Sequence, residues 1–254
     1  MRCLILACGV ALVVGCAPGS GQGSSSTSDP AIARPSVTKT IRIGTRKEPL
    51  TGIALFAGGG VGGIEPAILY HAGLTIYDDQ GDLHPHLAQK VPSVADGDWR
   101  VAADGRMEVT WRLRPNIVWH DGTQLSAGDF IFGMQVLRDE EIPVPRARWL
   151  RLVDEVTAPD PTTLLVTWRQ PYILANASGP IDIAAVPGHI LGDLYAAGDK
   201  NVFVNSTYWT HTFVGLGPYK LGEWVLGSRQ QATAFDQYFL GRPKIDRIEW
   251  RFFQ

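Results

Sequence analysis

The stretch MEVTWRLRPNIVWHDGTQLSAGDFIFGMQVL, from Met107 to Leu137, predicts the local structure around which the rest of the chain is organised. Apolar and polar residues alternate from Met107 to Leu113, which is the period-two pattern of a strand with one buried and one exposed face. Asp104-Gly105, just upstream, is a dipeptide typical of tight hairpin turns. We therefore expect residues 99–102 to form the antiparallel partner of this strand.

The second half of the stretch predicts a turn followed by a helix. Residues 117–119 form a short apolar run that we expect to be a buried strand, and His120-Asp121-Gly122-Thr123 turns the chain away from it. Ser126 is a favourable residue for capping a helix, and Asp129 stands where the acid of a capping box belongs. The apolar stripe of the predicted helix consists of Phe130, Ile131, Met134 and Leu137.

The order of these residues resembles a known family. Residues 113–137 are similar to the LR strand, Trp, DGT turn and A-x-D-F/V helix start of the peptide, dipeptide and nickel class of extracellular solute-binding proteins, which serve ABC importers. The matching residues are Arg114, Trp119, Asp121, Gly122, Thr123, Ala127, Asp129 and Phe130. The resemblance implies a mixed α/β fold, namely a periplasmic-binding-protein-like type II lobe of mixed sheets and hairpins.

A second motif lies near the end of the chain. Residues 214–221, VGLGPYKL, followed by Trp224, resemble the G-T-G-P-Y-K-L motif of the same family. Gly215 and Gly217 would permit a tight backbone path where a ligand or the other lobe comes close. Leu216 stands where the family often has a small polar residue, so the resemblance implies a more apolar pocket than usual.

Other parts of the chain predict further short elements and match the family in order. We expect a first strand at residues 40–44, a helix at 67–73 that leads into a strand at 74–78, and a hairpin of 153–157 with 164–168. A final strand is expected at residues 245–252. The resemblance extends from about Ile41 to the end of the chain.

The composition limits the classes of function. A chain of 254 residues with 45% hydrophobic content can form one large or two small domains with a real core. The formal charge of -2 and the absence of a basic stripe argue against a nucleic-acid partner. The three cysteines, Cys3, Cys8 and Cys16, all lie near the amino terminus, so the region beyond them has no thiol for a disulfide, a zinc site or a nucleophile.

The amino terminus predicts export. Residues 1–15 carry one charge and an apolar run too short to span a bilayer, as in a secretory signal peptide. Residues 13–16, VVGC, resemble the bacterial lipobox, in which the cysteine becomes a lipidated amino terminus. We expect Cys16 to be anchored in membrane lipid, residues 16–38 to form a flexible tether, and residues 39–254 to form the lobe. An ordinary signal peptide cleaved nearby is the alternative.

No cofactor or metal is predicted. His84 and His86 suggest a metal site, but Pro85 fixes an extended backbone that turns the two imidazoles apart, so we expect a pair of surface residues without such a role. A hydrolase is disfavoured, because the sequence has no G-x-S-x-G elbow, no H-E-x-x-H motif and no convincing pair of acids. We therefore expect a protein that is not an enzyme.

The resemblance implies a set of ligand-contacting residues. Glu48 and Pro49 follow the first strand, which in the family leads into the ligand cleft, and Tyr70 lies on the first helix. Together with Gly215, Leu216 and Gly217, they are the expected contacts of a small solute, most simply a peptide. The family's acid that receives a peptide amino terminus lies in a part that this chain does not cover.

Length leads to a further expectation. Family members are roughly twice as long, so we expect a truncated first lobe without the second one, with an unpaired strand edge at residues 245–252 and poor solubility. The predicted function is that of a lipid-anchored, extracytoplasmic component that captures peptides or similar solutes for the permease subunits of an ABC importer, monomeric when complete. The alternative is a truncated sensor or interaction lipoprotein without transport activity.

Overall fold

The computed structural model describes residues 38–46, 65–144 and 146–253. The chain divides into two units, Met1–Val37 and Thr38–Gln254, and all described residues belong to the second. The predicted lipidation site Cys16 and the predicted ligand contacts Glu48 and Pro49 lie outside the described residues.

One antiparallel sheet contains the strand predicted at residues 107–113. Its order is β4-β5-β7-β6, with β4 at Trp99–Val101, β5 at Met107–Arg112, β7 at Thr163–Trp168 and β6 at Val153–Asp160. Along β5 the side chains of Met107, Val109 and Trp111 are buried, whereas Glu108 and Arg112 are exposed. The predicted half-buried strand is therefore confirmed. So are its hairpin with the segment that begins at residue 99 and the hairpin predicted for residues 153–157 and 164–168.

The predicted short strand at residues 117–119 is wrong. This segment forms only an isolated bridge between Val118 and Gln124, because the chain reverses at once. The N–H of Trp119 donates to the Thr123 carbonyl at 2.8 Å, and Gly122 supports the turn with a φ of 92°. Ile117 and Trp119 are nevertheless fully buried, so the apolar run was correctly assigned to the core.

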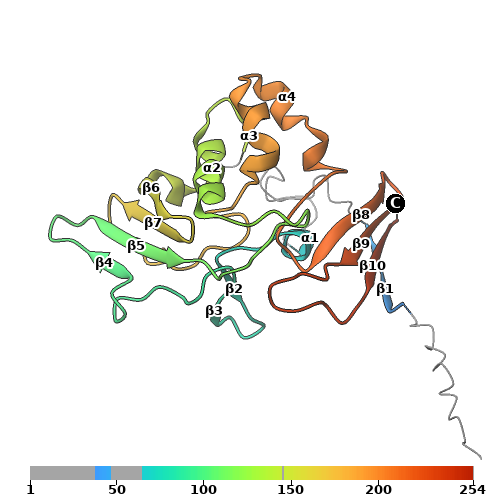
Figure 1. The fold of residues 1–254 in the computed structure, drawn as a ribbon, viewed down its shortest axis with the longest axis horizontal. Helices are drawn as coiled ribbons and strands as arrows, with labels where there is room; N and C mark the ends of the chain where they lie inside the picture. Colours follow the sequence, from blue (N-terminus) through green and yellow to red (C-terminus); the bar gives the residue numbers. More distant parts are fainter. Residues whose placement is uncertain (1–37, 47–64, 145, 254) are drawn as a thin grey trace, which may run out of the picture. The chain divides into compact units, whose positions relative to one another are not determined.

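Helix α2, Ala127–Arg138, begins where the sequence predicts. The Asp129 carboxylate accepts from the Ser126 N–H at 2.9 Å, which is the acidic half of the predicted capping box. The other Asp129 carboxylate oxygen accepts from the Gly188 N–H at 3.2 Å and so ties α2 to the start of α3, Gly188–Ala196. The buried face of α2 packs against β6 and β7 (Figure 1).

The second sheet is mixed and has the order β1-β10-β9-β8. Its strands are β1 at Thr40–Thr45, β10 at Arg247–Phe252, β9 at Arg229–Ala234 and β8 at Tyr219–Val225. Strand β10 pairs in parallel with β1 and antiparallel with β9. The expected unpaired edge at residues 245–252 is thus wrong, because β10 pairs with β1 on one side and with β9 on the other.

Shorter elements lie in the segments between these strands (Figure 1). They are α1 at Glu65–Tyr70, β2 at Thr75–Tyr77, β3 at Leu83–Pro85, α4 at Lys200–Val204 and two 3-10 turns at Arg148–Arg151 and Thr207–Trp209. A continuous core contains residues of both sheets, and its largest fully buried side chains are Trp111, Trp119, Trp168, Trp209, Tyr70, Phe130 and Phe203. Within the described ranges, no helix has the length and apolar character needed to cross a membrane.

Candidate functional site

Two glycines of the second sequence motif lie directly against the end of α1. A Cβ atom on Gly215 would lie 1.9 Å from the Tyr70 carbonyl oxygen, and one on Gly217 would lie 2.4 Å from the Leu69 carbonyl oxygen. The Gly217 N–H donates to the Tyr70 carbonyl at 3.0 Å, which satisfies an acceptor at the helix end. The close backbone approach predicted for these glycines is therefore present, and its partner is the chain's own helix.

His120 fixes the same junction from the other side. Its Nδ1 accepts from the Gly215 N–H at 3.1 Å, and its Nε2 lies 2.9 Å from the Gly217 carbonyl oxygen, to which it donates. The ring therefore carries its proton on Nε2, and burial lowers the pKa of His120 to about 4. A neutral imidazole thus holds the DGT turn against the glycine motif.

The structure brings most of the predicted ligand contacts together but encloses them. Tyr70 is fully buried, its hydroxyl lies 3.3 Å from the Gln230 Oε1, and burial raises the pKa of this hydroxyl. Leu216 is 1% exposed, and Gly215 and Gly217 are buried beside it. Contact of these four residues with a ligand stays a prediction.

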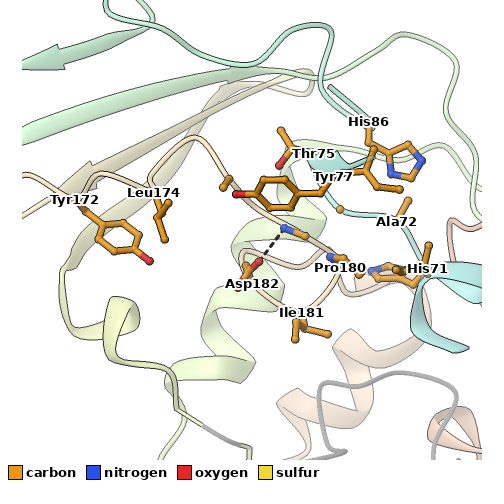
Figure 2. Close-up of a pocket in the computed structure, with 15 residues that line it drawn as sticks. His71, Ala72, Thr75, Tyr77, His86, Tyr172, Leu174, Pro180, Ile181 and Asp182 are labelled. Carbon is orange, nitrogen blue, oxygen red and sulfur yellow. Dashed lines mark hydrogen bonds between the residues drawn. The ribbon is translucent and has the colours of Figure 1, made fainter. Parts of the chain in front are cut away.

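A pocket of about 440 Å³ opens beside this junction (Figure 2). Its lining comes from residues 68–77, from His86, and from residues 172–182 of the segment that follows β7. The apolar lining consists of Ile68, Ala72, Ile76, Leu174, Ala177, Pro180 and Ile181. The volume lies within the range typical of small-molecule sites, roughly 300–1,000 Å³.

Asp182 is the acidic group of the pocket. Its Oδ2 accepts from the Gly179 N–H at 2.8 Å, drawn as the dashed line in Figure 2. Burial raises the pKa of this carboxyl, and no cation of the described residues offsets that effect. The carboxylate also helps burial to raise the pKa of the Tyr172 hydroxyl. The pocket wall therefore carries a half-buried acid that has no ionic partner within residues 38–46, 65–144 and 146–253.

His71 forms another polar part of the wall. The ring is 3% exposed and stacks on Trp119 at a centroid distance of 5.8 Å. Burial lowers the pKa of His71 to about 3, while a hydrogen bond to the Ala185 backbone acts in the opposite direction. Nδ1 has no hydrogen-bond partner among the described residues, so Nε2 makes the bond to Ala185 and Nδ1 is left as a buried acceptor.

The two histidines weighed as metal ligands have separate partners. The His84 Nε2 lies 2.7 Å from the Asp78 Oδ2 on the surface. His86 is only 5% exposed and hydrogen-bonds the Tyr238 hydroxyl at 2.8 Å, so its expected surface position is wrong. The two rings therefore have different neighbours. In the described part of the chain, no group of three or more potential ligands is placed to hold a metal ion.

Sequence reasoning did not identify the pocket. Its two main walls lie about 100 residues apart in the chain, and most of the lining residues are ordinary apolar types that equally well form a core. One signal was present in the sequence. The segment ASGPID, residues 177–182, places a glycine, a proline and an acid in a stretch for which no regular element was predicted.

Comparison with known proteins identifies a family of solute-binding proteins. Residues 89–254 match the model of bacterial extracellular solute-binding proteins, family 5 Middle. Protein XP55 of Streptomyces lividans is 30% identical over 174 residues, which are 68% of this chain and 28% of that protein. The oligopeptide-binding protein AppA of Bacillus subtilis is 26% identical over 152 residues, which are 58% of this chain and 26% of that protein.

Solved structures show the same fold. An oligopeptide-binding protein from Thermus thermophilus, complexed with a pentapeptide, superposes with a TM-score of 0.72 at 22% identity, over 85% of this chain and 41% of that one. NikZ from Campylobacter jejuni, in complex with Ni(L-His), gives 0.68 at 21% identity, over 84% and 39%.

The chain spans about a third of the length of the curated relatives it matches. The match of the family model nevertheless includes the central strand, the DGT turn, helix α2 and the glycine motif. The protein is a member of family 5 of the bacterial extracellular solute-binding proteins.

Proposed function

We propose that this chain belongs to the solute-binding component of an ABC importer, which captures peptides or similar small solutes outside the cytoplasmic membrane and delivers them to permease subunits. The observation that carries the proposal is the match to family 5 over residues 89–254. Relatives whose names describe peptide binding, such as AppA and the dipeptide-binding protein DppE of Bacillus subtilis, support peptides as the solute class. Members of this family are binding proteins and not enzymes.

The geometry offers this function a site of suitable size. The pocket of about 440 Å³ holds a few side chains of a solute, and its walls combine apolar surface with a small number of polar groups, as in most small-molecule sites. The buried junction of Tyr70 with Gly215, Leu216 and Gly217 lies at the end of α1, next in the chain to the pocket residues His71 and Ala72. We propose that Glu48, Pro49 and this junction contribute to the complete solute site.

Uptake by living cells tests the proposal. A host strain deleted for the gene would be compared with one that carries the gene again, and accumulation of isotopically labelled di- to pentapeptides would be measured. We expect deletion to lower uptake and the restored gene to recover it. Unchanged uptake of every peptide, together with another phenotype of the deletion, would contradict transport and favour a sensor or interaction lipoprotein.

We also propose that Cys16 carries the lipid anchor and that residues 16–38 tether the folded unit to the membrane. The support is the apolar run that ends in VVGC and the glycine- and serine-rich stretch that follows. Metabolic labelling with a palmitate analogue should mark the wild type and a Cys8→Ser control, because Cys8 lies in the segment that is removed. Labelling of a Cys16→Ser variant would contradict the proposal.

A further inference from the structure

We propose that the pocket of Figure 2 binds an apolar molecule through a primary ammonium group, which is held by the carboxylate of Asp182. This inference names the chemistry of the solute, and so it rests on the proposed solute-binding function. It also assigns a charge-recognition role to a residue of the segment after β7, where none of the predicted contacts lie.

The first support is the state of Asp182. One carboxylate oxygen is engaged by the Gly179 N–H at 2.8 Å, and the other has no partner among the described residues. The group is half-buried without a lysine or arginine beside it, an arrangement that costs solvation energy. A ligand cation at this oxygen would form a charge-assisted hydrogen bond of about 2.7–2.9 Å and would offset that cost.

The second support is the apolar wall around the acid. Figure 2 shows Tyr172 and Leu174 at the left of the pocket and His71 at the right, with Asp182, Ile181 and Pro180 between them. Removing apolar ligand surface from water contributes about 25 cal/mol per Å². The cavity of about 440 Å³ accepts an aromatic ring or a branched alkyl chain attached to the ammonium group.

The third support is the sign of the remaining polar groups. No lysine or arginine lines the described pocket, and His71 is neutral at physiological pH, with its buried Nδ1 as an acceptor. An anionic ligand would meet the carboxylate of Asp182 and no positive partner, so the site should reject acids by like-charge repulsion and desolvation. A ligand that carries hydrogen-bond donors can donate to both acceptors of the wall, the Asp182 carboxylate and the His71 Nδ1.

Calorimetric titration of the full chain with three probes of similar shape tests the inference. The probes are 2-phenylethylamine, 2-phenylethanol and 3-phenylpropionate. We expect the amine to bind about tenfold more tightly than the alcohol, as an added charge-assisted hydrogen bond implies, and the acid to bind more weakly still. Equal affinities of the amine and the alcohol in the wild-type chain would overturn the inference without reference to any variant.

Two matched variants locate the cation. Asp182→Asn keeps an oxygen that can accept from the Gly179 N–H but removes the charge, so amine affinity should fall to the level of the alcohol. Asp193→Asn removes the same charge from an exposed position on α3 outside the pocket and should change nothing. Undiminished amine binding by a folded Asp182→Asn chain would also overturn the inference.

Further measurements test whether the amine is a peptide amino terminus, and they distinguish failure of the pocket inference from failure of the proposed transport function. The peptide Phe-Gly-Gly and its N-acetyl form test whether the ammonium is a peptide amino terminus, in which case only the free form binds. If no amine binds while uptake still depends on the gene, the inference fails and the transport function stands. If the amine binds through Asp182 while uptake is independent of the gene, the proposed function fails and the pocket assignment stands.

Discussion

Replacing Gly215 with alanine should destabilise the fold strongly, because this glycine is where the second motif touches α1. A Cβ atom at this position would lie 1.9 Å from the Tyr70 carbonyl oxygen and 2.7 Å from the ring of Phe213. The backbone of Gly215 is outside the left-handed region, so alanine meets no conformational penalty there. The entire effect is therefore steric, and the closest atom belongs to the backbone, which cannot simply rotate away.

The magnitude follows from what must move. To restore ordinary contact at about 3.4 Å, α1 and the loop before β8 must separate by roughly 1.5 Å, an overpacking that costs about 1–3 kcal/mol. The same shift weakens the hydrogen bonds of His120 with the Gly215 backbone and of the Gly217 N–H with the Tyr70 carbonyl, which contribute about 1 kcal/mol each. We expect a loss of about 3–5 kcal/mol, a large part of the about 5–15 kcal/mol of a typical domain.

Urea unfolding followed by tryptophan fluorescence measures this loss. The matched control is Gly192→Ala in α3, where an added Cβ meets no atom within 4 Å and alanine favours the helix. The control should be neutral or more stable by about 0.5–1 kcal/mol. A Gly215→Ala chain less than about 1 kcal/mol below the wild type would refute the assignment of this glycine to a close backbone contact.

Three further predictions concern other parts of the fold. Asp129→Ala should lower the free energy of unfolding by about 2–4 kcal/mol in the same assay, because the N–H groups of Ser126 and Gly188 lose their acceptor; a loss near zero would argue against this tie. Acidification should destabilise the fold through the three histidines whose pKa burial lowers from 6.5 to about 3–4. These are His71, His86 and His120. As the pH falls, these histidines take up protons in the unfolded chain before they do so in the folded one. Their contribution to the free energy of unfolding is therefore fully present above pH 6.5 and should fall by up to about 1.4 kcal/mol per pH unit for each group down to about pH 4. A urea midpoint that does not change between pH 7 and 5 would contradict this. Amides of β10 should exchange hydrogen more slowly than the outward-facing amides of β1, since β10 is paired on both sides; equal exchange would mean that the strand is an edge.

The local elements of the fold follow from the sequence where periodicity and capping agree. The alternation at residues 107–113, the Asp104-Gly105 turn and the Ser126 to Asp129 cap each specify structure through neighbours a few residues away, and all three are present. The run at residues 117–119 was assigned wrongly, because a buried apolar segment has the same pattern whether or not it finds a strand partner.

Features that depend on distant partners could not be predicted in the same way. The pairing of β10 with β1 joins residues that lie 207 positions apart, as at Arg42 and Glu249, so the last strand looked unpaired in the sequence. His86 is buried only because the fold brings Tyr238 beside it, a partner that its own neighbours in the sequence do not indicate. The pocket likewise forms only where α1 and residues 172–182 meet. Asp182 differs from an ordinary surface acid only because the folded chain partly buries it in this wall.

Native mass spectrometry of the protein recovered from the extracytoplasmic fraction of its own host tests solute capture most directly. We expect part of the population to carry a small noncovalent solute that gentle activation releases, and a free amino group in the released molecule would agree with the role of Asp182. A spectrum that contains only the mass of the chain with its amino-terminal modification, even after peptides are added in excess, would contradict solute capture by this protein.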